Sequence, residues 1–305
     1  MSVNELVSPQ VTGRRDSSRA DGGKALPRYA AVMVHAGGDS PAADGRIALA
    51  IDIARRFGAS LVGVAGEALQ PPPVDPFGGG VMVGEIIDAE EERVQSNLQA
   101  ARTRFETLLR TAGLETEWRS SIASPTQIIA QGARSADLVV IGREPTRSGL
   151  EAQQCPDPGD LLMHAGRPLL VVPPGGNRLL AERIVLAWKD TREARRALWD
   201  ALPFLTRAAA VHVVEVAAEN ELQAAAARVD DVARHLTRHG VAAKGEAHRR
   251  REAKVADELI LVAEQNDADL IVAGGYGHAR LREWVFGGVT ADLLRHSPKC
   301  CLLSH

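Results

Sequence analysis

The sequence predicts an α/β protein of two tandem Rossmann-like domains, each a five-stranded mainly parallel sheet with helices on both faces. Short runs rich in β-branched residues alternate with longer segments of helical periodicity along the chain. These short runs are apolar without interruption, as is typical of parallel strands that are buried on both faces. A length of 305 residues, about twice the common domain size of about 150, agrees with two domains.

An internal repeat supports the two-domain organisation. Residues 135–142 (SADLVVIG) reappear as residues 267–274 (DADLIVAG), an offset of 267 − 135 = 132. Residues 164–171 (HAGRPLLV) align with residues 296–303 (HSPKCCLL), and 296 − 164 gives the same offset. Two blocks that keep one register across the intervening chain indicate a tandem duplication.

The first copy alternates strands and helices. Ala43–Phe57 is predicted to be a helix because apolar residues recur at helical spacing: Ile47, Ala50, Ile51 and Ala54. The long segment Glu85–Ala112 is predicted to be a helix whose apolar side carries Ile86, Val94, Leu98, Phe105 and Leu108. The other expected elements are the strands Ala30–His35, Ser60–Val64 and Thr116–Ser120, the helix Pro125–Ser135, and the strands Leu138–Ile141 and Leu169–Val172.

The second copy repeats this scheme. Its expected strands are Ile184–Ala187, Val211–Val216, Ala242–Ala247, Leu270–Ala273 and Cys300–Leu303. We expect a disordered tail at 1–27, because its composition is rich in Gly, Ser, Arg and Asp, followed by domains at 28–175 and 176–305. Residues 70–80, rich in Pro and Gly, are expected to form a surface loop. The connection Pro173–Asn177 is short, so the two halves should pack together.

Composition argues against several classes of partner. The net charge of −3 and the aromatic content of 4% give no basis for nucleic-acid binding. No apolar run approaches the roughly 20 residues that span a bilayer, so no membrane association is expected. The cysteines Cys155, Cys300 and Cys301 form no disulfide framework, and two of them are adjacent in a predicted buried strand. This pattern indicates reduced thiols and a cytoplasmic protein.

A glycine-rich stretch, GGYGHARLREWVFGGVTADLL, begins at Gly274, directly after a predicted strand. Open parallel sheets bind ligands beyond the carboxyl ends of their strands, where the strand order reverses. Gly287 and Gly288 precede a predicted helix at Ala291–His296, and the free N–H groups of such a helix start can hold an anion. Thr290 could add a hydroxyl donor.

The spacing Gly274-x2-Gly277-x9-Gly287 resembles the nucleotide signature G-x2-G-x9-G-[S/T] of the universal stress protein family, in its tandem two-domain form. The resemblance covers nearly the whole chain from about Arg28. It implies a cytoplasmic stress-response or regulatory protein with a Rossmann-like fold, dimerisation through the last strands and ATP bound at this loop. By that resemblance Gly274, Gly277, Gly287 and Gly288 would wrap the triphosphate, with Thr290 close by. From their places in the same stretch, Val289 is a further candidate as an N–H donor and His278 as a phosphate contact. An exposed loop position remains the alternative for His278.

The same resemblance assigns the rest of the nucleotide to two further loops. Ala187, Lys189 and Asp190 would lie against ribose and adenine, and the backbone of Val216 would meet the base. The chain departs from the pattern at Gly288, where the family has Ser or Thr, and at Lys189, where it has an acidic residue. A lysine there could pair with a phosphate, whereas Asp190 could orient ribose or hydrated Mg²⁺, so the need for a metal stays open.

The first copy lacks the glycine cradle. At the offset of 132, Gly277 matches Pro145, Gly287 matches Cys155 and Gly288 matches Pro156. Proline lacks an N–H and side chains obstruct a phosphate, so this half is expected to be the structural partner of a one-site pair. Because no convincing general base is visible, any ATP hydrolysis should be slow. The alternatives are a nucleotide-free interaction scaffold with a vestigial site and an enzyme of nucleotidyl chemistry.

Other motifs are interpreted as structural. Residues 35–40 (HAGGDS) are somewhat similar to an ATP pyrophosphatase loop, but Asp39 or Ser40 is expected to cap a helix with Pro41 at its first position. No P-loop or hydrolase triad is present. His212 is expected to be a packing residue and the basic run 248–251 (HRRR) to be solvated. Cys300 and Cys301 should face opposite sides of a strand, and no metal site is expected.

Pairing of Leu169–Val172 with Cys300–Leu303 within one chain would satisfy the edges that single-copy relatives pair between chains. This arrangement would make the chain an internal pseudo-dimer. A homodimer built on another surface stays possible.

Overall fold

A computed structural model describes residues 26–38, 40–70, 83–143, 154–251, 254–275 and 288–305. The predicted tail at 1–27, apart from its last two residues, and nearly all of the expected surface loop at 70–80 lie outside the described residues. The glycine loop lies outside them from residue 276 to residue 287.

Ten strands form a single sheet in the order β3-β2-β1-β4-β5-β10-β9-β6-β7-β8. The strands of the first half are β1 (Ala31–His35), β2 (Ser60–Gly66), β3 (Thr116–Ser121), β4 (Leu138–Gly142) and β5 (Leu169–Val172). Those of the second half are β6 (Arg183–Ala187), β7 (Ala210–Ala217), β8 (Ala243–Arg249), β9 (Leu270–Gly274) and β10 (Cys300–Ser304). Neighbours are parallel except β5 and β10, and both halves have the same internal order. The predicted fold class is therefore confirmed.

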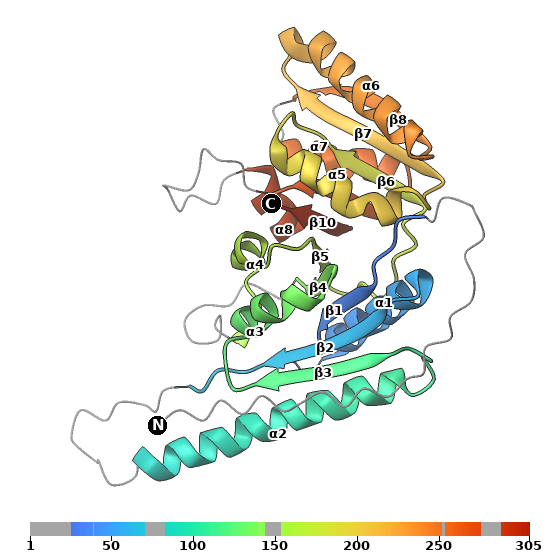
Figure 1. Ribbon diagram of the computed structural model, residues 1–305. Helices are drawn as coiled ribbons and strands as arrows, with labels where there is room; N and C mark the ends of the chain where they lie inside the picture. Colours follow the sequence, from blue (N-terminus) through green and yellow to red (C-terminus); the bar gives the residue numbers. More distant parts are fainter. Residues whose placement is uncertain (1–25, 39, 71–82, 144–153, 252–253, 276–287) are drawn as a thin grey trace, which may run out of the picture.

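Helices cover both faces of the sheet (Figure 1). One face carries α1 (Pro41–Phe57), α2 (Val83–Leu109), α5 (Arg192–Leu205) and α6 (Leu222–Arg238). The other carries α3 (Pro125–Gly132), α4 (Pro158–His164), α7 (Val255–Gln265) and α8 (Val289–His296). A 3₁₀ turn at Ala133–Ser135 follows α3, and another at Glu219–Glu221 precedes α6. Alternate strand residues enter the two cores: Cys300 lies in one and Cys301 in the other, as predicted.

Local sequence determines where α1 and α5 begin. Ser40 is the N-cap of α1, because the Ala43 amide donates to its hydroxyl at 3.3 Å, and Pro41 occupies the first helical position. Thr191 caps α5 in the same way, accepting from the Ala194 amide at 3.4 Å. The cap predicted at residues 39–41 is therefore confirmed with Ser40 as the capping residue.

One expectation for α2 is wrong. Val94, Leu98 and Phe105 are buried as predicted, but Ile86 is 40% exposed. A 27-residue helix is about 40 Å long, whereas the seven-residue strand β2 spans about 23 Å. The first turns of α2 therefore extend beyond the sheet, as Figure 1 shows, and their apolar residues have no strand to cover.

The two halves meet along β5 and β10, which pair antiparallel with Leu170 opposite Leu302. This confirms the predicted pairing inside one chain. The guanidinium of Arg143 adds a hydrogen bond across the boundary to the Ser297 carbonyl at 2.6 Å. On the face that carries α1 and α5, the aromatic rings of Tyr29, Phe57 and Phe204 make three edge-to-face contacts with centroids 5.0–5.6 Å apart. The halves thus share one continuous core.

Candidate nucleotide site

The predicted site residues of β6, β7 and β9 converge at one edge of the second half. β6 and β9 are parallel neighbours, with Ala187 opposite Ala273, so Ala187 and Gly274 end side by side. On the other side of β6, Ala187 lies opposite Val214, and Val216 follows two residues further along β7. Strand order reverses between β6 and β9, since β7 and β8 lie to one side and β10 to the other. This is the position at which doubly wound sheets bind ligands.

Gly274 is also required by packing. A Cβ added at this residue would lie 2.6 Å from the backbone nitrogen of Ala194 and 2.7 Å from the carbonyl carbon of Glu193. The absence of a side chain therefore lets the first turn of α5 approach the end of β9. The next residue, Gly275, contacts the first half instead, because its Cβ would lie 2.3 Å from Leu162 of α4. Both glycines have a structural reason that is independent of any ligand.

The start of α8 lies beside this edge. Gly288 precedes the helix with φ 141° and ψ 172°, a conformation that is essentially restricted to glycine. Among the described residues, no side chain caps this helix and no acceptor outside the helix receives the N–H groups of its first turn. The hydroxyl of Thr290, which is buried, donates to the Gly274 carbonyl at 3.4 Å and so joins α8 to β9. Gly288, Val289 and Thr290 therefore form a helix start beside β9, and helix starts of this kind can hold an anion.

The loop after β6 differs from a simple carboxylate site. Lys189 and Asp190 are exposed, and the Asp190 carboxylate pairs with Arg195 at 2.5 Å. The sequence analysis missed Glu193, which is buried in the first turn of α5 and pairs with Arg192 at 2.6 Å. Burial alone would raise the pKa of Glu193, but hydrogen bonds from Arg192 and from Thr191 outweigh it and the net pKa is lowered. The signal that could have identified Glu193 is its position in the first turn of a helix, because a carboxylate is stabilised near a helix N-terminus.

A network of charged side chains lies next to Val216, whose register partner in β8 is His248. Glu246 accepts from His212 at 2.8 Å and contacts His248 at 3.3 Å and Lys244 at 2.9 Å. Burial raises the pKa of Glu246, but these hydrogen bonds outweigh it and lower the value to about 2. His212 is thus a satisfied buried residue, as predicted.

The arginines of the basic run 248–251 are exposed, as predicted, whereas His248 is half-buried. His248 also lies 3.5 Å from Glu258, Arg249 pairs with Glu219 at 2.7 Å, and Arg251 lies 3.8 Å from Glu258. The sequence did not predict these ion pairs, because the acidic partners Glu219 and Glu258 are not adjacent to the run in sequence. The fold brings them to the end of β8.

The equivalent edge of the first half is closed by its own side chains. Ala36 and Trp188 make the same backbone hydrogen bond to the neighbouring strand, so His35 corresponds to Ala187. Arg46, only 1% exposed, donates to the His35 carbonyl at 2.7 Å and to the Gly37 carbonyl at 3.1 Å. Burial first, and Arg46 second, hold the pKa of His35 well below its usual value. A guanidinium therefore occupies the end of β1.

Gly277, His278 and Gly287 lie outside the described residues, so their predicted phosphate contacts stay predictions. Within the part of the chain that the structure describes, no group of three or more His, Cys, Asp or Glu side chains could hold a metal ion. Across the same residues, no helix is long and apolar enough to cross a membrane.

Comparison with known proteins places this geometry in a family. The model of the universal stress protein family matches residues 181–305. The chain carries a universal stress protein domain. This domain contains β6–β10 and every residue of the predicted site, and the match confirms the family resemblance seen in the glycine spacing. A search of curated proteins found no match.

Solved structures extend the likeness to both halves. A universal stress protein from Archaeoglobus fulgidus is 14% identical with a TM-score of 0.62, over 90% of this chain and 97% of that chain. A functionally unknown protein from Pseudomonas aeruginosa PAO1 is 17% identical with a TM-score of 0.54, over 90% and 92%. A putative universal stress protein from Pseudomonas aeruginosa UCBPP-PA14 is 18% identical with a TM-score of 0.53, over 90% and 93%. At these identities the likeness shows a shared fold.

Proposed function

We propose that this chain is a cytoplasmic stress-response regulator that binds one molecule of ATP in its universal stress protein domain. The observation that carries the proposal is the convergence, at the strand-order reversal, of the ends of β6, β7 and β9 with the uncapped start of α8. Doubly wound sheets bind nucleotides at this point, and an uncapped helix start favours phosphate. We propose that residues 28–175 and 176–305 form two domains, of which the second binds ATP and the first is its structural partner.

The proposed contacts follow from the positions of the described residues. The N–H groups of Gly288 and Val289 would face the phosphates, together with Gly277, Gly287 and His278 from the loop. The Thr290 hydroxyl would exchange its hydrogen bond to the Gly274 carbonyl for one to a phosphate oxygen. The exposed ammonium of Lys189 would reach the phosphates as a point charge. The backbone of Val216 would meet the base, and Ala187 would leave space above the end of β6.

Slow or no hydrolysis is part of the proposal. A general base needs a carboxylate or imidazole that can accept a proton from water. At this edge the two described carboxylates nearest the β6 loop, Asp190 and Glu193, are engaged by Arg195 and Arg192. Mg²⁺ would require Asp190 to leave Arg195, so we propose that any metal is held mainly by the nucleotide phosphates. The bound nucleotide would order the loop and bias the surface that is offered to a partner.

An ATP titration followed by calorimetry tests the site. The double variant Gly277→Asp, Gly287→Asp places two carboxylates in the cradle and should lower the affinity at least about tenfold by charge repulsion. The matched control, Pro145→Asp with Cys155→Asp, places the same charges at the repeat-equivalent positions of the first half and should bind ATP like the wild type. Equal affinity of the cradle variant and the wild type would contradict the proposal.

The alternative is an interaction scaffold that binds no nucleotide. The glycine loop and the start of α8 would then be inherited structure with no ligand. Release of small molecules from freshly purified, denatured protein separates the two functions. ATP or ADP near one per chain supports the regulator. Absence of nucleotide, together with no thermal shift at millimolar ATP, supports the scaffold.

A further inference from the structure

A groove of about 540 Å³ lies between α5 and α6, on a different face of the domain from α8. Its walls include Trp188, Leu198, Trp199, Arg228, His235 and Arg238. Two carboxylates also line it, and both are paired: Asp190 with Arg195 and Asp231 with Arg234. The volume lies within the range of about 300–1,000 Å³ that is usual for small-molecule pockets. We propose that this groove binds a small aromatic anion, a ligand that is distinct from the nucleotide.

Trp199 supplies a surface for an aromatic ring. Its side chain is 51% exposed although tryptophan is usually well buried. Two imidazoles hold the indole by edge-to-face contacts, with centroids 6.0 Å away for His235 and 5.2 Å away for His239. Because neighbours fix its orientation, this exposed ring can stack on a planar ligand with little loss of side-chain entropy.

Trp188 adds an unsatisfied donor to the wall of the groove. The residue is only 8% exposed, and its buried Nε1–H has no acceptor among the described residues. A buried donor without a partner is unfavourable, because its hydrogen bond to water is lost without replacement. A ligand oxygen that displaced the neighbouring wall atoms and reached this N–H would satisfy it.

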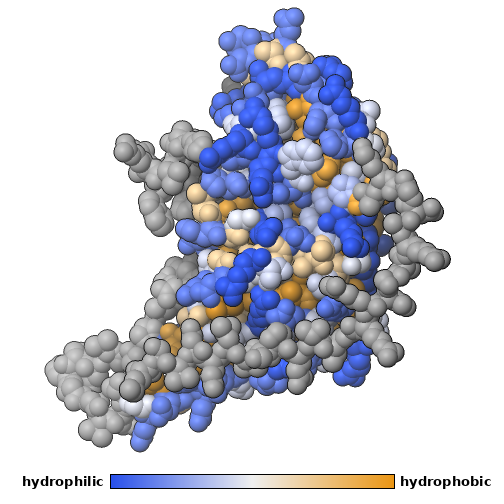
Figure 2. Space-filling view, viewed as in Figure 1, coloured by the Kyte–Doolittle hydropathy of each residue, from blue (hydrophilic) through white to orange (hydrophobic). Residues whose placement is uncertain are grey.

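Arg238 supplies the charge that selects an anion. The other lining guanidiniums are engaged: Arg195 pairs with Asp190 and Arg228 with Glu215, each at 2.5 Å. Within the described residues, no carboxylate pairs with Arg238. Hydrophilic side chains dominate the surface over α6 (Figure 2), so a ligand charge there would stay near water while its ring contacts Trp199. A carboxylate on an aromatic ring combines both contacts.

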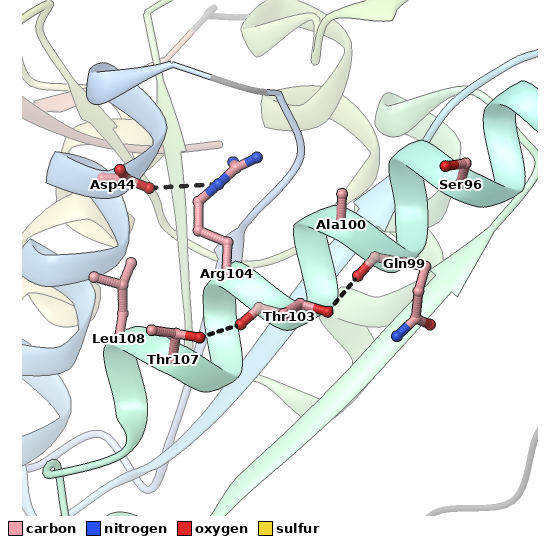
Figure 3. A pocket seen from close by; sticks show the side chains of 8 residues that line it. All are labelled: Asp44, Ser96, Gln99, Ala100, Thr103, Arg104, Thr107 and Leu108. Atoms are coloured by element: carbon pink, nitrogen blue, oxygen red, sulfur yellow. Dashed lines mark hydrogen bonds and ion pairs between the residues drawn. The ribbon is translucent and has the colours of Figure 1, made fainter.

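The first half shows that this chemistry is specific to the α5–α6 groove. Its equivalent groove, about 710 Å³ between α1 and α2, is lined mostly by polar and aliphatic side chains of α2, and none of its lining residues is aromatic (Figure 3). Its guanidinium, Arg104, points toward Asp44, with the atoms 3.7 Å apart. Two grooves at equivalent places thus have different linings, and the first serves as an internal control.

Indole N–H signals in nitrogen-15 NMR spectra test the proposal on the full chain. The probe is 1-naphthoate, and 1-naphthalenemethanol is the matched neutral probe with the same ring. We expect 1-naphthoate to shift the Trp199 and Trp188 signals saturably, with at least about tenfold weaker binding of the neutral probe. Trp199→Ala should abolish saturable binding. Arg238→Gln should lower the affinity for 1-naphthoate to about that of the neutral probe.

Thr103→Ala, which alters the α1–α2 groove, should leave the affinity unchanged. The proposal is overturned if 1-naphthoate gives no saturable shift of these two signals at about 10 mM. It is also overturned if Trp199→Ala retains wild-type affinity, or if both probes bind equally. Arg238→Gln lies on the exposed side of α6 and should fold normally, which the unshifted NMR signals of the first half would verify.

Discussion

Leu170 of β5 lies opposite Leu302 of β10, where the only antiparallel pairing among the described strands joins the two halves. Both leucines are fully buried. The last strand of each half therefore covers the edge of the other, and ten strands form one sheet. An arrangement that the family resemblance assigns to a dimer is thus made within a single chain.

Gly275 should be a sensitive position at the boundary of the halves. Its Cβ would lie 2.3 Å from Leu162, which is only 2% exposed and cannot move into solvent. We expect Gly275→Ala to lower the free energy of unfolding by about 1–3 kcal/mol through overpacking. Chemical denaturation measures this. The control Gly84→Ala, where a Cβ meets nothing within 4 Å, should cause no loss of stability. The double variant Leu162→Ala, Gly275→Ala should be less destabilising than the sum of the two single variants. Additive effects would show that the two residues are not in contact.

Gly288 should be required for the start of α8. Its backbone conformation is disfavoured for any residue with a Cβ, so Gly288→Ala should cost about 1–3 kcal/mol or displace the first turn. Either effect should weaken ATP binding, which a titration measures. Gly38→Ala imposes a positive φ of 87° on a non-glycine residue in the first half and should leave ATP binding unchanged. Equal losses in both variants would mean that general destabilisation, rather than the helix start, governs affinity.

His35 should make stability depend on pH in a defined direction. Its folded-state pKa lies well below the unfolded value of about 6.5, so the unfolded state binds more protons below that pH. The contribution of His35 is therefore complete above about pH 6.5 and is lost as pH falls toward the folded pKa, by up to about 1.4 kcal/mol per pH unit. Urea denaturation between pH 7 and 5 should show this slope, and His35→Gln should reduce it. An unchanged slope in the variant would rule out His35 as its source.

The cysteines should differ in reactivity. Burial raises the pKa of Cys300 to about 12 and that of Cys301 to about 11, whereas Cys155 is half-buried. At pH 8 the thiolate fractions of Cys300 and Cys301 would be roughly one in 10⁴ and one in 10³. Brief treatment with iodoacetamide, followed by peptide mass spectrometry, should find Cys155 modified first, with Cys300 and Cys301 modified after denaturation. Simultaneous labelling of the folded protein would show that β10 is not buried.

Periodicity and the repeat were sufficient to predict the strands and a mainly parallel sheet in each half, whereas the pairing of β5 with β10 was expected from the family resemblance. These features depend on uninterrupted apolar runs such as residues 138–141 and 270–273, whose burial requires no knowledge of distant partners. The exposed Ile86 was not predictable in the same way, because the pattern that buries Val94 gives no information on where the sheet ends.

The site could be located from the glycine spacing, but its chemistry could not. Whether Gly274 serves a phosphate or the approach of α5 depends on a contact with Ala194 that is distant in sequence. Likewise, Arg46 reads as an ordinary helix residue until the fold places it at the end of β1. Pairings such as Asp190 with Arg195 are local, yet the choice among several nearby charges is made by side-chain geometry.

The stoichiometry of ATP binding to the full chain tests the one-site account most directly. Equilibrium dialysis at saturating ATP should give one nucleotide per chain, because the start of α8 is open whereas Arg46 occupies the equivalent edge of the first half. A value near two would contradict the division between the halves. A value of zero at millimolar ATP would contradict the nucleotide site itself.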